Sequence, residues 1–169
     1  PMKPIPKCDP TEKQNALDRG TGAMVKTEAG SWFVKKIVSR VEPAMLRASG
    51  GRLQFGGGPR VNLTVTGRKS GEARTTALGY FTVGDEVILM ASNFGGQNLP
   101  AWYLNLVAAG ECELQWRGGS GAYNAREAEE PERTELYELA NQLFSVYGKY
   151  AAKTDGIRKI PVMVLTPAA

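Results

Sequence analysis

The chain has 169 residues, of which 42% are hydrophobic and 22% are charged, the balance expected of a single globular domain. Its formal net charge of +4 suits an anionic small molecule, a nucleic acid or an anionic membrane surface, and does not separate them. The chain has no His, which excludes Ser-His-Asp and Cys-His nucleophiles and most catalytic zinc sites. We therefore expect no metal site, and proton transfer has to use Tyr, Lys, a carboxylate or water.

Residues 1–30 carry Pro, Gly, Thr and charged residues without periodicity, which predicts a flexible N-terminal arm. This arm contains Cys8, and the second cysteine, Cys112, lies in a predicted strand. Two cysteines are too few for a Cys-rich metal cluster, and we expect both to be free thiols in a reducing compartment. With no apolar run of about 18 residues and no visible signal peptide, the expected location is the cytoplasm.

Residues 31–169 are predicted to form one domain, which begins with an amphipathic helix over 31–48 capped by Ser31. Pro43 is expected to kink this helix. The polar side of the helix is cationic and its aromatic residues come first, so two interpretations stay open. The helix either packs on the core or lies on a membrane surface, which would make the protein a peripheral membrane protein.

Strands are predicted from about residue 60 onward, and most of them are joined by short turns. The expected strands span 61–66, 74–83, 86–92, 112–117, 122–128 and 160–166, and the expected helices span 100–109 and 131–144. A Tyr-rich segment, 145–155, leads to the last strand. Crossover units of strand, helix and strand are scarce, which disfavours a doubly wound fold. The pattern predicts a mainly β fold of the α+β class: a small antiparallel barrel with flanking helices.

Residues 66–74, called the cationic turn below, follow the apolar run 61–65 and read TGRKSGEAR. Glycine lets backbone N–H groups approach a ligand, and Arg and Lys supply positive charge, so this turn predicts an anion site. It is not a P-loop, because Arg68 stands where Gly should precede Lys69 and the following residues predict a strand. A solvated basic hairpin is the alternative interpretation.

A second anion site is predicted at the start of the 100–109 helix, because helix N-termini bind anions. Two residues of this helix, Trp102 and Tyr103, are either core aromatics or part of the same groove. A row of aromatics spaced by three is either helix packing or a lid that stacks a planar substrate: Phe144, Tyr147 and Tyr150. Without His, Tyr147 is the candidate hydrogen-bond or proton donor. These features together predict a groove for a phosphorylated, aromatic ligand.

Several segments keep a characteristic order and spacing over about residues 60–167. They are Thr66-Gly67-Arg68-Lys69-Ser70-Gly71, Arg74, Ala91-Ser92-Asn93, Pro100-Ala101-Trp102-Tyr103-Leu104-Asn105-Leu106, the Tyr147 to Tyr150 spacing, Thr154-Asp155 and Ile160-Pro161-Val162. In these segments the sequence resembles the deazaflavin (coenzyme F420)-dependent nitroreductase and quinone reductase family of actinobacteria.

The resemblance implies a split β-barrel of the FMN-binding type, with reduced F420 (F420H2) in a groove. It implies an oxidoreductase that passes a hydride from the deazaflavin C5 to a planar, electron-poor acceptor. Such acceptors are a quinone, a nitroaromatic, or an α,β-unsaturated lactone such as a coumarin or furanocoumarin.

The resemblance also implies roles for residues, by motif position. Arg68, Lys69, Ser70 and Arg74 hold the phosphate and the acidic tail; Met90, Ala91, Ser92 and Asn93 line the deazaflavin; Ala101, Trp102, Tyr103, Leu104 and Asn105 complete the cofactor groove. Tyr147 faces the substrate, and Tyr147 and Ser92 are the catalytic candidates. An ordinary strand-end hydroxyl is the alternative interpretation of Ser92.

Four positions depart from the family pattern. Asn93 stands where a Lys is common, which removes one charge from the tail site. Phe144 stands where a substrate-side Tyr can occur, and Gly79 stands where a bulky aromatic can sit. Gly156-Ile157 look like a small insertion before the last strand. The first departure bears on cofactor affinity, and the others bear on the choice of substrate.

Three other functions are weighed against this one. An FMN-dependent split-barrel oxidoreductase is the alternative enzyme, and a cofactor carrier without turnover uses the same groove. A nucleic-acid-binding barrel needs exposed aromatics interleaved with cations along its strands, whereas the cations here cluster at one turn. We therefore expect a small, planar substrate as the partner, no nucleic acid, and a monomer.

Overall fold

The structure is a computed structural model and describes residues 4–8, 41, 44, 48, 59–144 and 146–168. The strands are β1 (Arg60–Thr66), β2 (Ala73–Gly79), β3 (Phe81–Val83), β4 (Glu86–Met90), β5 (Glu111–Trp116), β6 (Gly119–Glu127) and β7 (Val162–Pro167). The helices are α4 (Ala101–Ala109), α5 (Glu132–Leu143), α6 (Val146–Thr154) and the short 3-10 helix η2 (Asn93–Gly95). The helices predicted at 100–109 and 131–144 are confirmed as α4 and α5, and the Tyr-rich segment contains α6.

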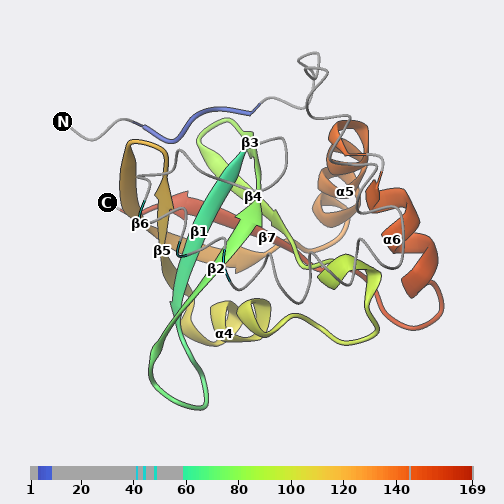
Figure 1. Ribbon diagram of the computed structural model, residues 1–169. Helices are drawn as coiled ribbons and strands as arrows, with labels where there is room; N and C mark the ends of the chain where they lie inside the picture. Colours follow the sequence, from blue (N-terminus) through green and yellow to red (C-terminus); the bar gives the residue numbers. More distant parts are fainter. Residues whose placement is uncertain are drawn as a thin grey trace.

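The strands form one seven-stranded sheet in the order β2-β1-β5-β6-β7-β4-β3, and every neighbouring pair is antiparallel. β2 and β3 are the two edges of this sheet, yet only Tyr80 separates them along the chain. Because one residue spans less than about 4 Å, the sheet has to curl until its two edges approach each other there. The result is the split barrel that the sequence predicted, with α5 and α6 on one side and α4 at one end (Figure 1).

The single strand predicted over 74–83 is wrong, because the chain changes partners in its middle. Gly79 makes the last pair of β2, with Arg60, and Phe81 makes the first pair of β3, with Ile88. Tyr80, between them, is buried, and its hydroxyl donates a hydrogen bond to the Pro6 carbonyl at 2.9 Å. The apolar pattern continues through Tyr80, so neighbouring residues do not signal that the chain changes its partner strand there.

A smaller difference concerns the hairpin between β5 and β6. The expected turn over 118–121 is shorter in the structure, because Trp116 already pairs with Gly119. Gly118 adopts a φ of 96°, in the left-handed region that glycine tolerates. β6 therefore begins three residues before the strand predicted at 122–128.

The core lies on both faces of β4 and β7. Val87 and Leu89 point into the barrel with Met163 and Leu165, whereas the alternate residues of the two strands pack outward against α5. Strands buried on both faces read as continuous apolar runs, which is why the sequence here is EVILM and VMVLTP. The α5 residues that cover the outward face are Leu136, Ala140 and Leu143.

The described part of the N-terminal segment lies against β3. Cys8 and Thr82 exchange hydrogen bonds at 2.9 and 3.1 Å, and Lys7 pairs with Asp85 at 3.1 Å. Main-chain groups of residues 4–8 thus complete the edge of the sheet, and the flexible arm predicted over residues 1–30 stays a prediction. Both cysteines are free thiols, as predicted.

Most of the helix predicted over 31–48 falls outside the described residues. Its three described members, Val41, Ala44 and Ala48, are helical and exposed. The kink at Pro43 is not among the described features. Within the ranges that the structure covers, no helix has the length and apolar character needed to cross a membrane.

Candidate functional site

One end of the barrel gathers the three segments that the sequence assigns to a groove. Strands alternate in direction from β1 through β5, β6 and β7 to β4, so β1 and β4 run the same way. The cationic turn follows β1 and the 91–96 loop follows β4, and both therefore leave the sheet at the same end. α4 lies at this end too, which is the lower end in Figure 1.

The cationic turn is folded tightly on itself by backbone hydrogen bonds. The Gly67 N–H donates to the Glu72 carbonyl at 2.8 Å, and the Gly71 N–H donates to the Gly67 carbonyl at 2.7 Å. A Cβ at position 67 would lie 2.7 Å from Ser70 Oγ and 3.2 Å from the Glu72 oxygen, so no larger residue fits without movement. Gly71 has a φ of +70°, which also favours glycine.

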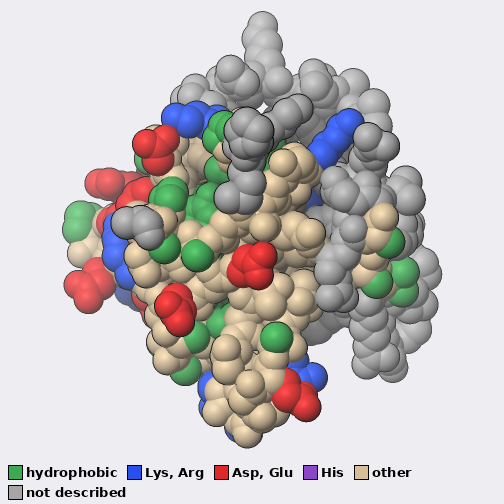
Figure 2. Space-filling view, turned by 90° about the vertical axis from the view of Figure 1, so that its left-hand side faces the viewer, with side chains coloured by type: hydrophobic (Ala, Val, Ile, Leu, Met, Phe, Trp, Pro, Cys, Tyr) green, Lys and Arg blue, Asp and Glu red, His purple; other side chains and the backbone are tan. Residues whose placement is uncertain are grey.

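The cations of this turn differ in their partners. Arg74 Nη2 bonds Glu72 Oε2 at 2.8 Å and Ser70 Oγ at 3.3 Å, so its charge is partly neutralised within the turn. Arg68 and Lys69 are exposed and form no ion pair in the described part of the chain. Figure 2 shows Lys and Arg side chains at the lower end of the molecule, where the turn lies in Figure 1. The turn thus presents two available positive charges, and Arg74 and Ser70 mainly maintain its shape.

α4 contributes residues of two kinds. Asn105 accepts a hydrogen bond from the Arg68 N–H at 3.2 Å, which ties the cationic turn to the helix. Ala101 is exposed, and Leu104 and Asn105 are half-buried. Trp102 and Tyr103 are both 8% exposed and belong to the barrel core.

Trp102 and Tyr103 are buried, as the core interpretation of this helix expects, and their place in the cofactor groove stays a prediction. Their rings meet edge to face at 6.3 Å, and the Tyr103 hydroxyl donates to Glu127 Oε2 at 2.6 Å. Burial, together with this hydrogen bond, raises the pKa of Tyr103 to about 12. The two side chains anchor α4 on the barrel, which is the core interpretation that the sequence left open.

The 91–96 loop holds an unusual backbone conformation. Asn93, Phe94 and Gly95 have successive φ values of 47°, 55° and 72°. For a non-glycine residue this region costs about 1–2 kcal/mol, so surrounding contacts have to maintain it. The Gly95 and Gly96 N–H groups donate to the carbonyls of Ser92 and Asn93 at 2.9 Å.

The other predicted members of this segment differ in exposure. The Asn93 side chain donates to the Asn98 carbonyl at 2.7 Å, and both Ser92 and Asn93 are half-buried. Met90 is 8% exposed and Ala91 is fully buried, so their side chains belong to the two clusters of the core. Of the four residues expected to line the deazaflavin, Ser92 and Asn93 therefore have the accessible side chains.

A row of aromatic rings connects Tyr147 to the 91–96 loop. The Tyr147 ring contacts that of Tyr150 at 5.9 Å between centroids, and Tyr150 contacts Phe94 at 6.5 Å, both edge to face. Tyr147 also contacts Phe144 and Tyr137 at 6.1 and 6.3 Å. In the described residues no hydrogen bond, ion pair or ring contact joins Tyr147 to the cationic turn. The structure thus brings the turn to α4, and the loop to α6.

Tyr147 is held as a neutral phenol. Burial raises its pKa to about 12, and the positive charge of Arg60 opposes this shift only in part. At neutral pH the hydroxyl is protonated, as in an ordinary tyrosine, and can donate a hydrogen bond. Within the described ranges this hydroxyl makes no hydrogen bond, whereas the Tyr147 carbonyl accepts one from the Tyr137 hydroxyl at 2.6 Å.

Sequence patterns missed two residues that shape this region, Tyr137 and Arg158. Arg158 donates to the carbonyls of Gly96, Ser92 and Ala91, which precede it by 62 to 67 positions. Such a contact leaves no local pattern, because its acceptors are main-chain atoms that any residue supplies. The only signal was the unusual pair Gly156-Ile157 just before Arg158.

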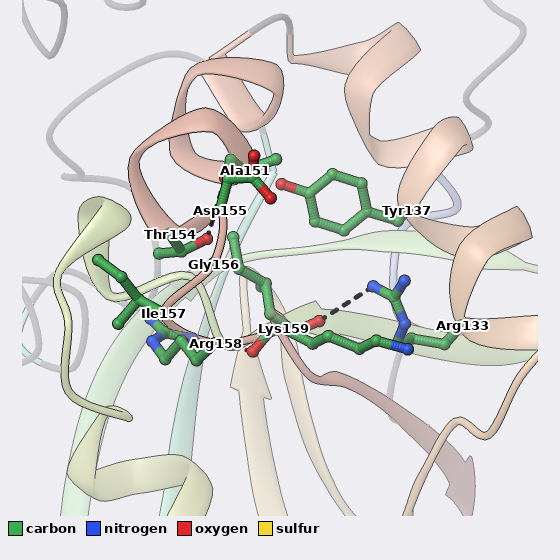
Figure 3. Close-up of a pocket in the computed structure, with 10 residues that line it drawn as sticks. Arg133, Tyr137, Ala151, Thr154, Asp155, Gly156, Ile157, Arg158 and Lys159 are labelled. Atoms are coloured by element: carbon green, nitrogen blue, oxygen red, sulfur yellow. Dashed lines mark hydrogen bonds between the residues drawn. The ribbon is translucent and has the colours of Figure 1, made fainter.

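A hollow of about 530 Å³ lies between α5, α6 and the segment that follows α6 (Figure 3). Tyr137, Thr154 and Arg158 are among the residues that line it, so it is beside the aromatic row and not at the cationic turn.

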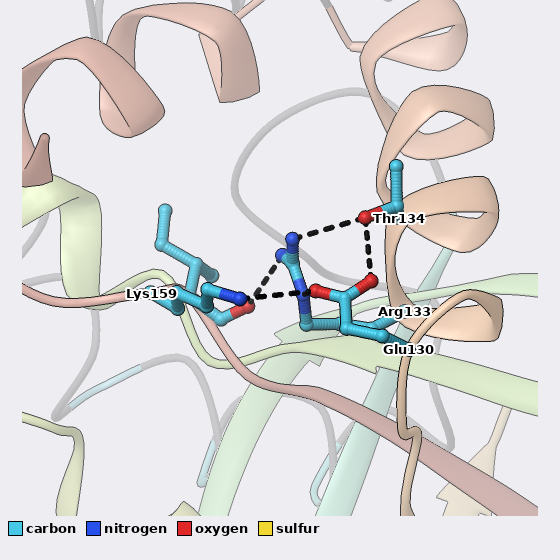
Figure 4. A network of polar contacts seen from close by, with 5 residues as sticks. Glu130, Arg133, Thr134 and Lys159 are labelled. Atoms are coloured by element: carbon cyan, nitrogen blue, oxygen red, sulfur yellow. Dashed lines mark hydrogen bonds and ion pairs between the residues drawn. The ribbon is translucent and has the colours of Figure 1, made fainter.

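One wall of this hollow is a network of ion pairs (Figure 4). Glu130 accepts from Arg133 Nε and Thr134 Oγ1 at 2.6 Å and from Lys159 Nζ at 3.4 Å. The hydrogen bonds from Thr134 and Arg133 lower the pKa of Glu130 to about 2. These groups satisfy one another, so this wall is structural.

Comparisons with known proteins identify the family of the chain and its fold. The family model for the F420H(2)-dependent quinone reductase matches residues 38–167. An F420H(2)-dependent quinone reductase of Mycobacterium tuberculosis is 32% identical over 133 residues, covering 75% of this chain and 88% of that protein. A solved F420-H2 dependent reductase (FDR-A) is 33% identical with a TM-score of 0.58, over 63% of this chain and 93% of that one.

Other solved structures extend the likeness. A protein solved as a domain-swapped dimer is 29% identical with a TM-score of 0.60, over 75% of this chain and 95% of that one. HutZ of Vibrio cholerae shares only the fold, at 8% identity and a TM-score of 0.51, over 66% of this chain and 82% of that one. The predicted family and split-barrel fold are confirmed: the chain belongs to the F420H2-dependent quinone reductase family, oxidoreductases whose cofactor is reduced F420.

Proposed function

We propose that this protein transfers a hydride from reduced F420 to a planar, electron-poor acceptor, with quinones as the first class. The same chemistry extends to nitroaromatics and to α,β-unsaturated lactones of the coumarin type. The proposal depends on one arrangement of three features on the same barrel. The cationic turn, with two exposed cations, and the strained 91–96 loop leave one end of the barrel, and the neutral phenol of Tyr147 lies on the side next to the loop.

The donor set of the barrel end fits the cofactor. Arg68 and Lys69 provide positive charge for an acidic tail, and the backbone of the cationic turn is fixed by Gly67. Ser92 and Asn93, half-buried beside main-chain groups, suit the edge of a planar ring. When bound, reduced F420 supplies the hydride from its deazaflavin ring.

Tyr147 is the proposed donor to the acceptor's oxygen. Hydride addition places negative charge on a quinone oxygen or on the carbonyl oxygen of a lactone, and a phenol O–H stabilises that charge. Tyr147 is a neutral phenol at neutral pH, as any tyrosine is, and its carbonyl accepts a hydrogen bond from the Tyr137 hydroxyl. The aromatic row from Tyr147 to Phe94 offers faces and edges on which a planar acceptor can stack. Ser92 is the second proposed polar contact near the reacting atoms.

The test is oxidation of F420H2 followed by its absorbance, with a quinone, a nitroaromatic and a coumarin as separate acceptors. In parallel, the protein is titrated with F420 and with FMN. We expect tight F420 binding, weak FMN binding and turnover with the quinone. Preferential FMN binding would instead support the alternative FMN-dependent oxidoreductase, and F420 binding without turnover of any acceptor would indicate a carrier.

Two further expectations belong to this proposal. We propose a monomer, which light scattering of the purified protein tests directly; a dimer would contradict it. For the segment 32–48 two interpretations stay open: it packs on the core, or it contacts an anionic membrane surface, since its polar side is cationic and its aromatic residues come first. Co-sedimentation with anionic liposomes, with and without residues 1–48, is the test.

A further inference from the structure

Arg158 is the residue through which the 91–96 loop is held on the body of the protein. Its Nε and Nη2 atoms donate to the Gly96 carbonyl at 3.1 and 2.9 Å. Nη2 also donates to the Ser92 carbonyl at 3.0 Å, and Nη1 donates to the Ala91 carbonyl at 3.4 Å. One guanidinium thus bonds the first, second and last residues of the loop.

The charge of Arg158 has no carboxylate partner among the residues that the structure describes. Its neighbours are carbonyl dipoles, and burial lowers its pKa from the ordinary value, with Tyr137 opposing that shift. An arginine remains charged even so. The Arg158 guanidinium therefore acts by orienting the loop carbonyls, and not by pairing with a carboxylate.

The segment that carries Arg158 is itself fixed to the end of α6. The N–H groups of Ile157 and Arg158 both donate to the Thr154 carbonyl at 3.0 Å. Thr154 is buried, and its hydroxyl donates to the Tyr150 carbonyl at 3.0 Å. Arg158 therefore extends from a rigid helix end toward the loop, and Figure 3 shows it beside Ile157 at the rim of the hollow.

The loop needs such a support, because its conformation is unfavourable by itself. Asn93 and Phe94 have positive φ values, and the loop's own hydrogen bonds close only two narrow turns. On its other side Gly95 lies close to α6: a Cβ there would be 3.2 Å from the Tyr150 ring and 3.1 Å from Lys153. Loop and helix are thus in direct contact, and Arg158 joins them at a second point.

We propose that Arg158 is a positioning residue, whose bonds to the loop carbonyls set where Ser92 and Asn93 lie relative to Tyr147. This rests on the proposed function, in which the loop meets the cofactor and Tyr147 meets the acceptor. Misplacement of about 1 Å between reacting groups lowers a rate by about 100-fold, so a shifted loop should slow hydride transfer. The charges proposed to hold the acidic tail of F420 lie on the cationic turn, which does not contact Arg158, so the affinity for F420 should fall less than the rate.

The experiment compares Arg158→Gln and Arg158→Lys with the control Lys159→Gln. Lys159 is the next residue and also a cation, but its side chain is 77% exposed and, among the residues that the structure describes, forms its ion pair with Glu130. For Arg158→Gln we expect the single-turnover rate of F420H2 oxidation by a quinone to fall about 10- to 100-fold, and F420 affinity to fall less than the rate. Arg158→Lys, whose ammonium can replace Nη2 alone, should lose less of the rate than Arg158→Gln. The control should match the wild type in both quantities.

A second readout does not depend on turnover. Hydrogen exchange of the Gly95 and Gly96 amides, which are bonded inside the loop, should speed up about tenfold in the Arg158 variants and not in the control. If the wild type fails to oxidise F420H2, the proposed function fails, while exchange still decides whether Arg158 holds the loop.

Three results would overturn the proposal. The first is a fully active Arg158→Gln variant, because a shorter, neutral side chain cannot replace the bonds that the guanidinium nitrogens make to Ala91, Ser92 and Gly96. The second is unchanged exchange at Gly95 and Gly96. The third is a variant in which F420 affinity and melting temperature fall together while the rate of the bound complex stays the same, which is the mark of a merely structural residue.

Discussion

The cationic turn and the 91–96 loop leave the same end of the barrel, yet they are built in opposite ways. The turn projects from the β1–β2 hairpin, keeps its shape by backbone bonds, and exposes Arg68 and Lys69. The loop is half-buried, holds two non-glycine residues at positive φ, and is tied to α6 through Arg158 and the Phe94–Tyr150 contact.

This difference matches what each region has to do. Attraction between charges falls slowly with distance, so exposed, mobile cations can hold an acidic tail. Hydride transfer needs its groups within a few tenths of an ångström, so the residues near it have to be fixed by packing. Substitutions in the cationic turn should therefore mainly change the affinity for F420, and substitutions near the 91–96 loop and α6 should mainly change the rate of hydride transfer.

The largest effect is expected for Tyr147→Phe, which removes only the proposed donor. We expect the hydride-transfer rate to fall about 100-fold, as for loss of a general acid, while F420 affinity stays constant. Tyr80→Phe is the control, because it also removes a buried hydroxyl, here bonded to the Pro6 carbonyl. Equal rates in the wild type and Tyr147→Phe would remove this residue from the mechanism.

Gly67→Ala should distort the cationic turn without removing a charge. The new Cβ would lie 2.7 Å from Ser70 Oγ and 3.2 Å from the Glu72 carbonyl oxygen. We expect F420 to bind about tenfold more weakly, since a distortion costing about 1.4 kcal/mol gives that factor. In Gly79→Ala the nearest described atom to the new Cβ is the Pro59 oxygen at 4.0 Å, so F420 affinity should not change. Equal titration curves for the two variants would contradict a structural requirement at Gly67.

Lys69→Ala should weaken F420 binding by about two- to fivefold at low ionic strength, the usual range for one exposed ion pair. The loss should shrink as salt is added, because salt screens exposed charges. Lys149→Ala, which removes an exposed cation from α6, is the matched control. An affinity loss that does not depend on salt would argue against a charge interaction at this turn.

Tyr103→Phe should change stability and not binding. It removes the hydrogen bond to Glu127, which we expect to lower the free energy of unfolding by about 1 kcal/mol. The folded-state pKa of Tyr103, about 12, lies above its ordinary value of about 10, so the folded state retains the proton longer. Stability is therefore full below pH 10 and falls between pH 10 and pH 12.

Urea unfolding across this pH range measures both effects of Tyr103→Phe. Between pH 10 and pH 12 the free energy of unfolding should fall less in the variant than in the wild type. Weaker F420 binding by the variant would indicate that the Tyr103 hydroxyl takes part in binding the cofactor, and would contradict a purely structural role.

The sequence predicted the features that local patterns encode. Neighbouring residues encode the strands other than 74–83, the Gly-rich turn at 66–74 and the helix after Pro100, and the structure contains all of these. Partner exchange at Tyr80 and the bonds of Arg158 join residues far apart in the chain, and no neighbour signals them. Trp102 and Tyr103 were ambiguous for a third reason: an aromatic on a short helix suits a core and a groove equally well.

The most direct test measures F420 affinity and single-turnover hydride transfer side by side for Lys69→Ala and Tyr147→Phe. We predict that Lys69→Ala changes the affinity alone, in a salt-dependent way, and that Tyr147→Phe changes the rate alone. Two variants that alter the same quantity to the same extent would contradict the division of binding and chemistry between the turn and the α6 side of the barrel.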